Sequence, residues 1–402
     1  MKIVWLVSTL EQKGGGERFV LEGSLALRAL GHQVTVVCDR VHADASFDGR
    51  YDLSEVVSTE RHAISGGHYA LRALNKLRAA WALFGILRGL SPDLVICQSE
   101  FDAIRLFLVS RLKRFPYRVF VFGQMYQFST DISRYSSVFR RHLETIVASR
   151  PGYRDTVAMP PPKLGLLTTC ANEVVSRLKY RALRAADRVF TLSNQVRWEV
   201  SLIYGRDAAV CRAAFDASYI DARRVANPAP VGQTLRILSV CRLVEKKRVA
   251  LTIAAFSASS LKGRLFIVGT GSDEQRLKDL AASSPRRDDI CFLGAIDDAQ
   301  LQREIAAADC FVSMDVGDFD ISVVEAMGKG LRVIVPTDFD MSEFGAEFSG
   351  VSVVAPDVQT LARAIEAIPA MSQPTEANIP ALHRLTWQSM AQTCVTGISS
   401  PR

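Results

Sequence analysis

Short apolar runs alternate with longer amphipathic stretches along most of the chain. The first half holds five runs of this kind: Lys2–Val7, Gln33–Cys38, Asp93–Cys97, Tyr117–Phe122 and Arg188–Leu192. Between them, Arg18–Leu30 and Tyr69–Leu90 carry apolar residues at the spacing of a helix. Continuous apolar runs separated by amphipathic helices are typical of a parallel sheet that helices cover on both faces.

A second series of the same kind follows. Its predicted strands are Arg236–Val240, Arg264–Val268, Ile290–Leu293, Cys310–Met314, Arg332–Val335 and Val351–Val354. Its predicted helices are Arg248–Ser260, Glu274–Ala282, Ala299–Ala307 and Ser322–Lys329. The proline-rich segment Asn227–Gly232 stands between the two series. We therefore predict an α/β protein with two Rossmann-like, doubly wound domains, residues 1–212 and 213–382, hinged near residues 213–234.

The strand ends and the tail of the chain complete this prediction. In doubly wound sheets ligands bind outside the carboxyl ends of the strands, so two such domains predict a cleft between them. After an expected loop at Met371–Pro380, helical spacing returns around Trp387, and we predict a helix over about 383–402 that packs back on the first domain. Residues 131–170 are irregular and contain three consecutive prolines at 160–162, so no element is predicted there.

Composition narrows the class of protein. Hydrophobic residues make up 48% and charged residues 23% of the 402 residues, the proportions of a globular protein with large cores. The apolar start at Met1–Val7 is too short for a signal peptide, and no run reaches the roughly 18 apolar residues of a spanning helix. Eight scattered cysteines without a CxxC pair indicate buried, reduced thiols. These features predict a cytoplasmic protein.

Charge is spread unevenly between the two halves. Residues 1–212 carry 30 Lys and Arg against 19 Asp and Glu, a net charge of +11, whereas residues 213–402 carry 19 against 23, a net charge of −4. A basic half indicates a polyanionic partner, which can be nucleic acid, an anionic membrane or an acidic substrate. No nucleic-acid-binding module is recognisable, so we expect no nucleic acid as a partner.

Residues 61–92 concentrate basic charge in one segment. They contain five Lys or Arg residues but no Asp or Glu, and Trp81 and Phe84 lie among them. A basic helix with aromatic residues suits the interface of an anionic membrane. A helix that buries its apolar side and exposes a solvated basic side explains the same pattern. A peripheral position on the inner face of the cell membrane therefore stays open.

Glycines and cations follow two of the predicted strands. Gly14–Arg18 opens a helix, where glycine lets a ligand approach the backbone and unpaired N–H groups attract phosphate. A plain strand-to-helix turn explains that segment equally well. In Ser239–Arg248, the two cations Arg242 and Lys247 suit a diphosphate, whose charge would otherwise need a metal ion. A solvated basic turn is the alternative there.

A third segment, Phe311–Gly330, combines a strand end, an acidic loop and a helix that carries Glu325. A carboxylate at that position can accept two hydrogen bonds from a ribose diol. The alternative is a carboxylate that is stabilised by the dipole of its own helix.

Several segments, taken in order, resemble those of one known family. In the second half, SVCRLVEKKR, LFIVGTGSDEQRL, ICFLGAIDDAQL and DFDISVVEAMGKGLRVIVP resemble its GRL-x-x-x-KG, IVGxGxxxxxL, VxFLGxVxxxxL and EAMAxGxPVI segments. In the first half, GGGERF, ALRALGHQVTVVC and RALRAADRVFTLSN resemble its GGAERx motif, the helix and strand that follow, and the stretch before the hinge. Over nearly its whole length the chain resembles the retaining, GT-B-fold glycosyltransferases of family 4, the group 1 transferases. This resemblance implies two Rossmann-like domains that face a cleft, and a nucleotide-sugar donor.

The resemblance also implies roles for individual residues. Arg242 and Lys247 would bind the donor diphosphate and stabilise the departing nucleotide. Glu325 would hold the nucleotide ribose, with Ile321 and Ser322 beside it as donor-binding residues. The other expected donor contacts are Gly294 and Ala295, whose loop reaches the base through its backbone, and Gly15 and Gly16, which would face the diphosphate from the first domain.

The chain departs from the family at several positions. Gly317 stands where the acidic motif of the family has its first glutamate, the carboxylate that contacts the donor sugar. We expect Asp318 or Asp320 to replace it and count both as catalytic, with Arg242 and Lys247. Cys241 and Arg248 replace two glycines of the family, and the regions of a first-domain histidine hold Gln98, Glu100 and Gln124.

Asp318-Phe319-Asp320 is also a DxD sequence, the metal-binding signature of the other glycosyltransferase fold. There the signature follows a single nucleotide-binding domain near the start of the chain, whereas here it lies beyond residue 310, in the second predicted sheet. Because the neighbouring cations already match the charge of a diphosphate, we expect neither a metal ion nor a cofactor.

The sequence therefore predicts a glycosyltransferase that moves a hexose or similar sugar from a nucleotide-diphosphate-sugar donor. The expected acceptor is a lipid-linked, lipopolysaccharide or exopolysaccharide glycan, and transfer would be retaining and independent of metal. The alternative is a catalytically weak relative that binds a nucleotide sugar or serves as an assembly subunit. A nucleotide-sugar epimerase of the same fold would need an acid/base set that we do not find in the sequence.

Overall fold

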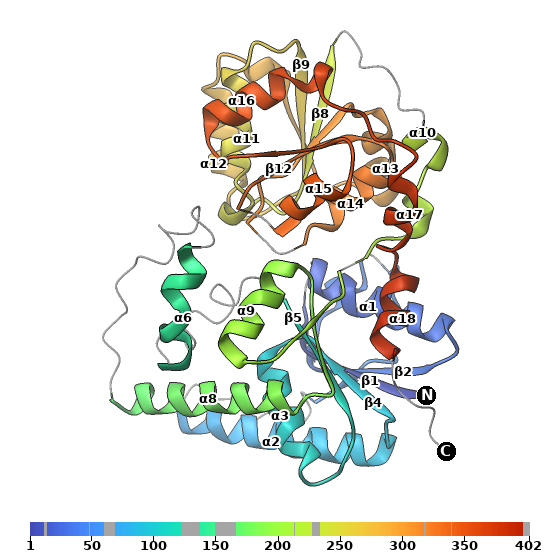
Figure 1. Ribbon diagram of the computed structural model, residues 1–402, viewed down its shortest axis with the longest axis vertical. Helices are drawn as coiled ribbons and strands as arrows, with labels where there is room; N and C mark the ends of the chain where they lie inside the picture. Colours follow the sequence, from blue (N-terminus) through green and yellow to red (C-terminus); the bar gives the residue numbers. More distant parts are fainter. Residues whose placement is uncertain are drawn as a thin grey trace. The chain divides into compact units, whose positions relative to one another are not determined.

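The computed structural model describes residues 1–11, 14–47, 49–59, 69–122, 137–148, 166–212, 214–226, 234–316, 319–338 and 340–396. These residues form two compact units (Figure 1). The first unit holds the described residues up to Arg212 and those from Trp387 onwards, and the second holds those of Ala214–Thr386.

Parallel strands form the centre of the first unit. They are β1 (Lys2–Leu10), β2 (Gln33–Val41), β3 (Val57–Ser58), β4 (Leu94–Cys97), β5 (Tyr117–Val121), β6 (Arg188–Thr191) and β7 (Ala209–Val210). Their order is β3-β2-β1-β4-β5-β6-β7, and every neighbouring pair is parallel. The five predicted strands are confirmed. The edge strands β3 and β7 were not predicted, because two residues are too few to form a recognisable apolar run.

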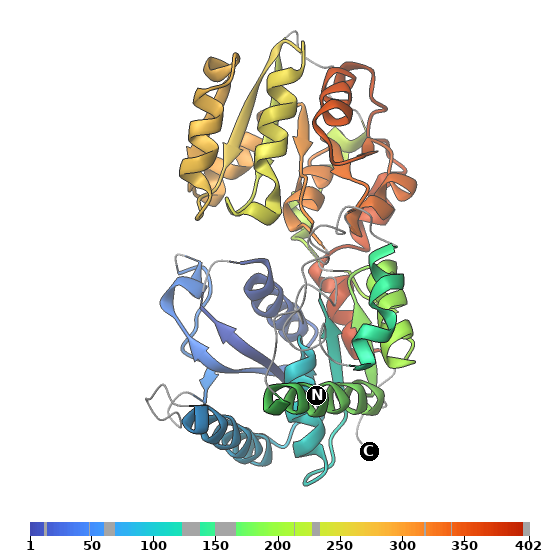
Figure 2. The same ribbon diagram turned by 90° about the vertical axis from the view of Figure 1, so that its left-hand side faces the viewer.

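Helices cover both faces of this sheet (Figures 1 and 2). They are α1 (Gly15–Ala29), α2 (Tyr69–Leu90), α3 (Glu100–Ser110), α6 (Ser137–Ala148), α8 (Leu166–Ala185), α9 (Asn194–Tyr204) and, from the end of the chain, α18 (Trp387–Val395). Helix α6 and the start of α8 lie within residues 131–170, where the sequence pattern placed no element, while the three prolines lie outside the described residues.

Aromatic packing explains why the last helix belongs to the first unit. Trp5 of β1 is fully buried and packs edge-on against Phe19 of α1, with ring centroids 5.7 Å apart. Trp387 of α18 contacts Phe19 in turn, at 6.0 Å. A Cβ atom on Gly23 of α1 would lie 2.6 Å from the Trp5 ring, so this close helix–strand contact requires glycine.

The second unit has a parallel sheet of the same kind. Its strands are β8 (Leu235–Val240), β9 (Gly263–Val268), β10 (Ile290–Gly294), β11 (Cys310–Val312), β12 (Arg332–Pro336) and β13 (Val351–Val354), in the order β10-β9-β8-β11-β12-β13. All six predicted strands are confirmed in the described residues, and all pairs are parallel. Because the strands are parallel, all their carboxyl ends lie at one edge.

Helices also cover this second sheet. They are α10 (Ala222–Ala226), α11 (Val249–Ala258), α12 (Glu274–Ala282), α13 (Asp298–Ala307), α14 (Ile321–Gly328), α15 (Phe344–Glu347), α16 (Val358–Glu366) and α17 (Asn378–His383). Helix α17 corrects two predictions. It begins at Asn378, inside the expected loop. Pro380 does not prevent this helix, because it lies in the first turn, where the backbone N–H has no partner within the helix. The tail helix, predicted over about 383–402, begins later than expected, at Trp387, because residues up to His383 belong to α17.

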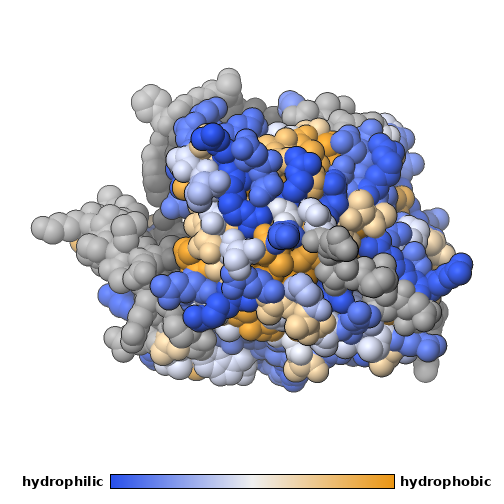
Figure 3. All heavy atoms as spheres, turned by 90° about the horizontal axis from the view of Figure 1, so that it is seen from above, coloured by the Kyte–Doolittle hydropathy of each residue, from blue (hydrophilic) through white to orange (hydrophobic). Residues whose placement is uncertain are grey.

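The surface and the thiols match an ordinary globular protein. All eight cysteines are free; five are buried, whereas Cys241 and Cys291 are half-buried and Cys170 is exposed. The face of the protein in Figure 3 is mainly hydrophilic, with smaller hydrophobic areas between. Within the residues that the structure describes, no helix is long and apolar enough to cross a membrane.

Candidate functional site at the carboxyl edge of the second sheet

The predicted cations lie in the turn that follows β8. This turn contains one short 3₁₀ helix, η5 (Glu245–Lys247), and α11 begins directly after it. Arg242 is exposed there, while Lys247 is largely buried. The turn therefore presents one cation to solvent and holds the other against the protein.

Lys247 forms an ion pair with Asp315, which follows β11. Burial by itself would lower the pKa of Lys247, but the carboxylates of Asp315 and Asp320 outweigh it and raise that pKa. Lys247 therefore stays protonated throughout the neutral range. The second oxygen of Asp315, Oδ1, is buried without a hydrogen-bond partner in the described residues. With Asp315, Asp318 and Asp320 within six residues, the sequence of this loop indicates a need for nearby cations, and the β8 turn supplies one of them, Lys247.

Asp320 stabilises the start of α14. Its Oδ1 accepts a hydrogen bond from the Ser322 N–H at 3.0 Å, and its Oδ2 accepts one from the Ser313 hydroxyl at 2.9 Å. Burial raises the pKa of Asp320, and the charge of Lys247 opposes that increase. Both oxygens of this predicted catalytic residue are thus engaged within the unit. Gly317 and Asp318, the other positions in question, lie outside the described residues.

The remaining predicted residues of α14 lie at the same end of the sheet. Ile321 and Ser322 are half-buried in its first turn, and Glu325 is buried one turn further along. The helix thus places Glu325 among apolar neighbours, where a carboxylate is costly unless hydrogen bonds or cations offset the lost hydration.

Arg248 explains why the turn tolerates a missing glycine. Its backbone is left-handed, with φ 47° and ψ 36°, a conformation that costs a non-glycine residue about 1 kcal/mol or more. Its guanidinium forms two hydrogen bonds, at 3.0 and 2.8 Å, with the buried carboxylate of Asp338 after β12. This bidentate ion pair offsets the strain and joins the β8 turn to β12.

Glycines after β9 let the backbone approach the β8 turn closely. A Cβ atom on Gly269, whose φ is 125°, would lie 1.9 Å from the carbonyl oxygen of Cys241. Cys241 itself replaces a family glycine, and burial raises the pKa of its thiol to about 12, so the thiol is neutral at physiological pH. Gly269–Gly271 (GTG) thus lets the chain after β9 pack against the backbone of the β8 turn. The sequence alone did not assign it this role.

The loop after β10 follows a glycine in the left-handed conformation, and its next residue is exposed. Gly294 has a φ of 67°, and its carbonyl accepts a hydrogen bond from the Gly269 N–H at 2.8 Å. Ala295 is exposed, so the loop is accessible at the position where a base contact is expected.

In the first unit, Gly15 and Gly16 form the first turn of α1, after β1. Both are exposed, and a Cβ atom on either would meet nothing within 4 Å. Gly14 at the N-cap supplies no side chain to cap the helix. The first N–H groups of α1 are therefore not occupied by a capping side chain, which is the condition for binding an anion there.

The three residues in the regions of the missing first-domain histidine differ in their surroundings. Glu100 is buried and pairs with the buried ammonium of Lys179, at 4.0 Å, so it holds α3 to α8. Gln98 follows β4, and its Oε1 is buried without a hydrogen-bond partner in the described part of the chain. Gln124 lies outside that part.

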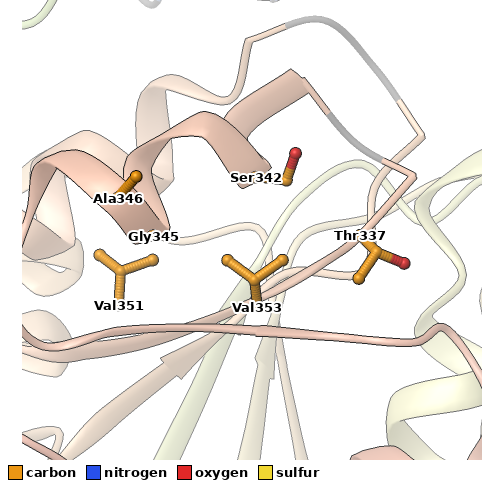
Figure 4. Close-up of a pocket in the computed structure, with 6 residues that line it drawn as sticks. All are labelled: Thr337, Ser342, Gly345, Ala346, Val351 and Val353. Atoms are coloured by element: carbon orange, nitrogen blue, oxygen red, sulfur yellow. The ribbon is translucent and has the colours of Figure 1, made fainter.

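A separate open hollow of about 500 Å³ lies beside β13 (Figure 4). Small side chains line it: Thr337, Ser342, Gly345, Ala346, Val351 and Val353. None of the predicted site residues that the structure describes borders the hollow. None of the described residues that line it carries a charge that could recognise a diphosphate, and the hollow is not part of the candidate site.

Comparison with known families matches almost the whole chain. Residues 14–213 match the glycosyl transferase 4-like domain, and residues 224–379 match the glycosyl transferases group 1 family. The two matches divide the chain near the boundary between the compact units.

Individual relatives are more distant. The amylovoran biosynthesis glycosyltransferase AmsK of Erwinia amylovora is 34% identical over 112 residues, which span 25% of this chain and 28% of that protein. The structure of Alr3699/HepE from Anabaena in complex with UDP has a TM-score of 0.67 at 16% identity, over 98% of both chains. The lipopolysaccharide outer core galactosyltransferase WaaB, in its apo form, has a TM-score of 0.67 at 14% identity, over 98% of this chain and 99% of that chain.

Two parallel α/β units, the family matches and the shared GT-B fold agree, and the chain belongs to the GT-B glycosyltransferases.

Proposed function

We propose that this protein transfers a sugar, with retention and without a metal ion, from a nucleotide-diphosphate-sugar donor to a lipid-linked, lipopolysaccharide or exopolysaccharide acceptor. The observation that carries the proposal is the edge of the second sheet, where Arg242, Lys247 and Glu325 follow the strands that the group 1 family match includes. The UDP complex of Alr3699/HepE supports a UDP-sugar as the first donor to test.

In this proposal the cations stabilise the departing nucleotide. Negative charge develops on the diphosphate as the bond to the sugar breaks, and a fixed cation lowers the energy of that state. Lys247 suits this task because the neighbouring carboxylates keep it protonated. Arg242, which is exposed, can approach the same phosphates from the solvent side.

Asp315 sets a condition on donor binding. A diphosphate that reaches Lys247 must share the ammonium with this buried carboxylate or take its place. Sharing is feasible because an ammonium has three N–H donors. The donor diphosphate and the Asp315 carboxylate would then both bind the Lys247 ammonium, or compete for it.

The names of two relatives support the choice of acceptor. One takes part in amylovoran biosynthesis and another modifies the lipopolysaccharide outer core. We propose an acceptor of this class, and with it a cytoplasmic location at the inner face of the cell membrane.

The alternative is a catalytically weak nucleotide-sugar-binding or assembly subunit. Gly317 at the position of the family's first acidic residue favours it, as does the ion pair that occupies Lys247. Incubation with a panel of UDP-, GDP- and ADP-sugars, with and without candidate acceptors, distinguishes an active transferase from a nucleotide-sugar-binding subunit. Slow hydrolysis of one donor supports the enzyme. UDP binding without turnover of any donor supports the alternative.

A further inference from the structure

Asp315 leaves one buried carboxylate oxygen without a partner at the carboxyl edge of the second sheet. The residue lies in the loop that follows β11 and is 2% exposed. Its Oδ2 binds the Lys247 ammonium, whereas its Oδ1 is buried and accepts no hydrogen bond from the described residues. Few polar atoms in a folded protein stay in this state, because burial without a hydrogen bond is costly. Oδ1 is therefore a candidate contact for a bound group.

Backbone hydrogen bonds hold Asp315 and Lys247 in place. The Val316 N–H donates to the Lys246 carbonyl at 3.4 Å, so the loop after β11 is joined to the β8 turn. The Lys247 N–H donates to the Val244 carbonyl at 2.9 Å and closes the turn itself. Lys247 keeps 18% of its side chain exposed, so one partner of the ion pair reaches solvent. The pair is thus a fixed feature of this edge that a ligand can approach.

The neighbouring carboxylate of Asp320 has no oxygen left for a ligand. Its two oxygens accept hydrogen bonds from the Ser313 hydroxyl and the Ser322 N–H. Its charge still acts on the same lysine, because both carboxylates raise the pKa of Lys247. One ammonium thus faces two carboxylates. Of these three groups, all of which the structure describes, Asp315 is the one with an acceptor to offer.

The chemistry of a nucleotide sugar decides which of its groups can bind Oδ1. A diphosphate offers acceptor oxygens and negative charge, so it attracts Lys247 but repels Asp315. The hydroxyl groups of a sugar can donate a hydrogen bond to a carboxylate. In the strand order β10-β9-β8-β11, a base contact is expected after β10 and the diphosphate at the β8 turn. The sugar lies on the far side of the diphosphate from the base, and the next loop in that direction contains Asp315.

We propose that Asp315 selects the sugar of the donor: its Oδ1 accepts a hydrogen bond from a sugar hydroxyl, and its charge excludes sugars that carry a carboxylate. The inference rests on the proposed function and adds a substrate class to it, a neutral hexose rather than a hexuronic acid. Two carboxylates repel each other several times more strongly in a partly buried site than in bulk water. The same residue thus binds the neutral sugar and rejects the acidic one.

This role also separates the donor from the nucleotide that remains after transfer. A nucleoside diphosphate meets the charge of Asp315 without the compensating hydroxyl, so Asp315 weakens its binding. The intact donor regains that loss through the hydrogen bond to Oδ1. Asp315 therefore favours the donor over the product nucleotide, and this preference promotes product release, a step that limits the rate of many enzymes.

Binding of matched ligands to the full chain tests the proposal. Isothermal calorimetry compares UDP-glucose with UDP-glucuronate, and GDP-mannose with GDP-mannuronate, and each pair differs only in a hydroxymethyl or carboxylate group on the sugar. In the nucleotide series that binds more tightly, the native protein should bind the neutral sugar at least about tenfold more tightly than the acidic one. This comparison needs no variant. Equal affinity within the pair, a preference for the acidic sugar, or no binding of any of the four ligands would overturn the proposal.

Asp315→Asn removes the charge at nearly unchanged shape. Relative to the nucleoside diphosphate alone, the variant should bind the neutral nucleotide sugar about tenfold more weakly than the native protein does, and it should lose most of its discrimination against the acidic sugar. Asp288→Asn is the control for the same change of charge, because the Asp288 side chain is 96% exposed in the turn before β10, at the opposite edge of the sheet. Both affinity ratios should stay within about twofold in this control.

Thermal unfolding shows whether each variant is folded before its affinities are compared. A folded Asp315→Asn protein with the affinity ratios of the native protein would overturn the proposal. Weaker binding of the nucleoside diphosphate itself would do the same, because it would show that Asp315 helps to hold the nucleotide.

The proposed function is tested separately. Turnover of the preferred nucleotide sugar with an acceptor tests the transferase activity, whereas the affinity ratios test Asp315. Selective binding of the neutral sugar without turnover would keep the role of Asp315 and support the nucleotide-sugar-binding subunit. Turnover that uses neutral and acidic donors equally well would support the enzyme and overturn the role of Asp315.

Discussion

Arg248 holds a left-handed backbone conformation that glycine would hold without strain, and it forms a bidentate ion pair with the buried Asp338. We expect Arg248→Gly to destabilise the second unit by about 2 kcal/mol. The unpaired Asp338 costs about 3 kcal/mol, and the relieved backbone returns about 1. The double variant Arg248→Gly with Asp338→Asn should recover most of the loss. Thermal unfolding of the four proteins checks this cycle, and a single variant as stable as the native protein would contradict it.

Lys247 is the second residue whose role a single change reveals. Lys247→Ala should raise the activation free energy of transfer by about 3 kcal/mol and so slow turnover roughly 150-fold, as for the loss of one group that stabilises the charge of the leaving nucleotide. Lys246→Ala, at the exposed neighbouring position, is the control and should turn over normally. An early thermal transition in Lys247→Ala, or normal turnover, would mean that the ion pair with Asp315 serves only the fold.

The same lysine predicts a pH dependence. Its pKa is raised in the folded state, so the ion pair with Asp315 contributes its stability at every pH below the ordinary lysine pKa and loses it only in strongly alkaline solution. UDP affinity should therefore show no titration of Lys247 between about pH 6 and 9. Asp315→Asn should raise UDP affinity severalfold, because it removes the anion that competes for the ammonium; isothermal calorimetry measures both, and lower affinity in the Asn variant would show that Asp315 helps to bind the nucleotide.

At the scale of elements, Asp320 connects the acidic loop to α14. Asp320→Asn keeps a good N-cap but removes the charge, whereas Asp320→Ala removes the cap and should cost about 1 kcal/mol. If the carboxylate acts in transfer, Asp320→Asn should abolish turnover and retain UDP binding. A fully active Asn variant would leave Asp320 with the capping role alone.

Stability gives an independent check on Asp320. Because burial raises its pKa, its contribution favours the fold below the ordinary pKa of an aspartate and is lost as the pH rises through the raised folded value. Asp320→Asn should therefore melt no earlier than the native protein at pH 7, and its relative stability should fall at about pH 4. Melting curves at both values test this sign.

For the whole molecule, the central prediction concerns metal. The cations of the β8 turn supply the positive charge that a diphosphate needs, so turnover should survive EDTA. Complete loss with EDTA and recovery with Mn²⁺ would show that the DxD sequence at residues 318–320 binds a metal ion. Ca²⁺ added in place of Mn²⁺ is the control for general ionic effects.

The sequence alone determined the architecture of each unit. Apolar runs and helical spacing located the long strands, because burial on both faces demands continuous apolar residues. They also determined that Arg242, Lys247 and Glu325 follow strands or begin helices of one parallel sheet, whose carboxyl ends share an edge. The pattern failed for the two-residue strands, for α6 and for α17, where local signals are too short or too irregular.

Only the tertiary structure decided how the charged residues pair. Asp315 and Lys247 are 68 residues apart, and Arg248 and Asp338 are 90 apart, in turns after strands that the order β8-β11-β12 brings together. No local pattern encodes such a pair, since it depends on strand order and on how each turn aims its side chain. For the same reason Asp320, which the sequence presented as a catalytic carboxylate, proved to have both oxygens bonded at the start of α14. A buried charge needs a partner, because an unpaired charge inside the protein is too costly. Each of these groups therefore pairs with whichever group the fold places within reach.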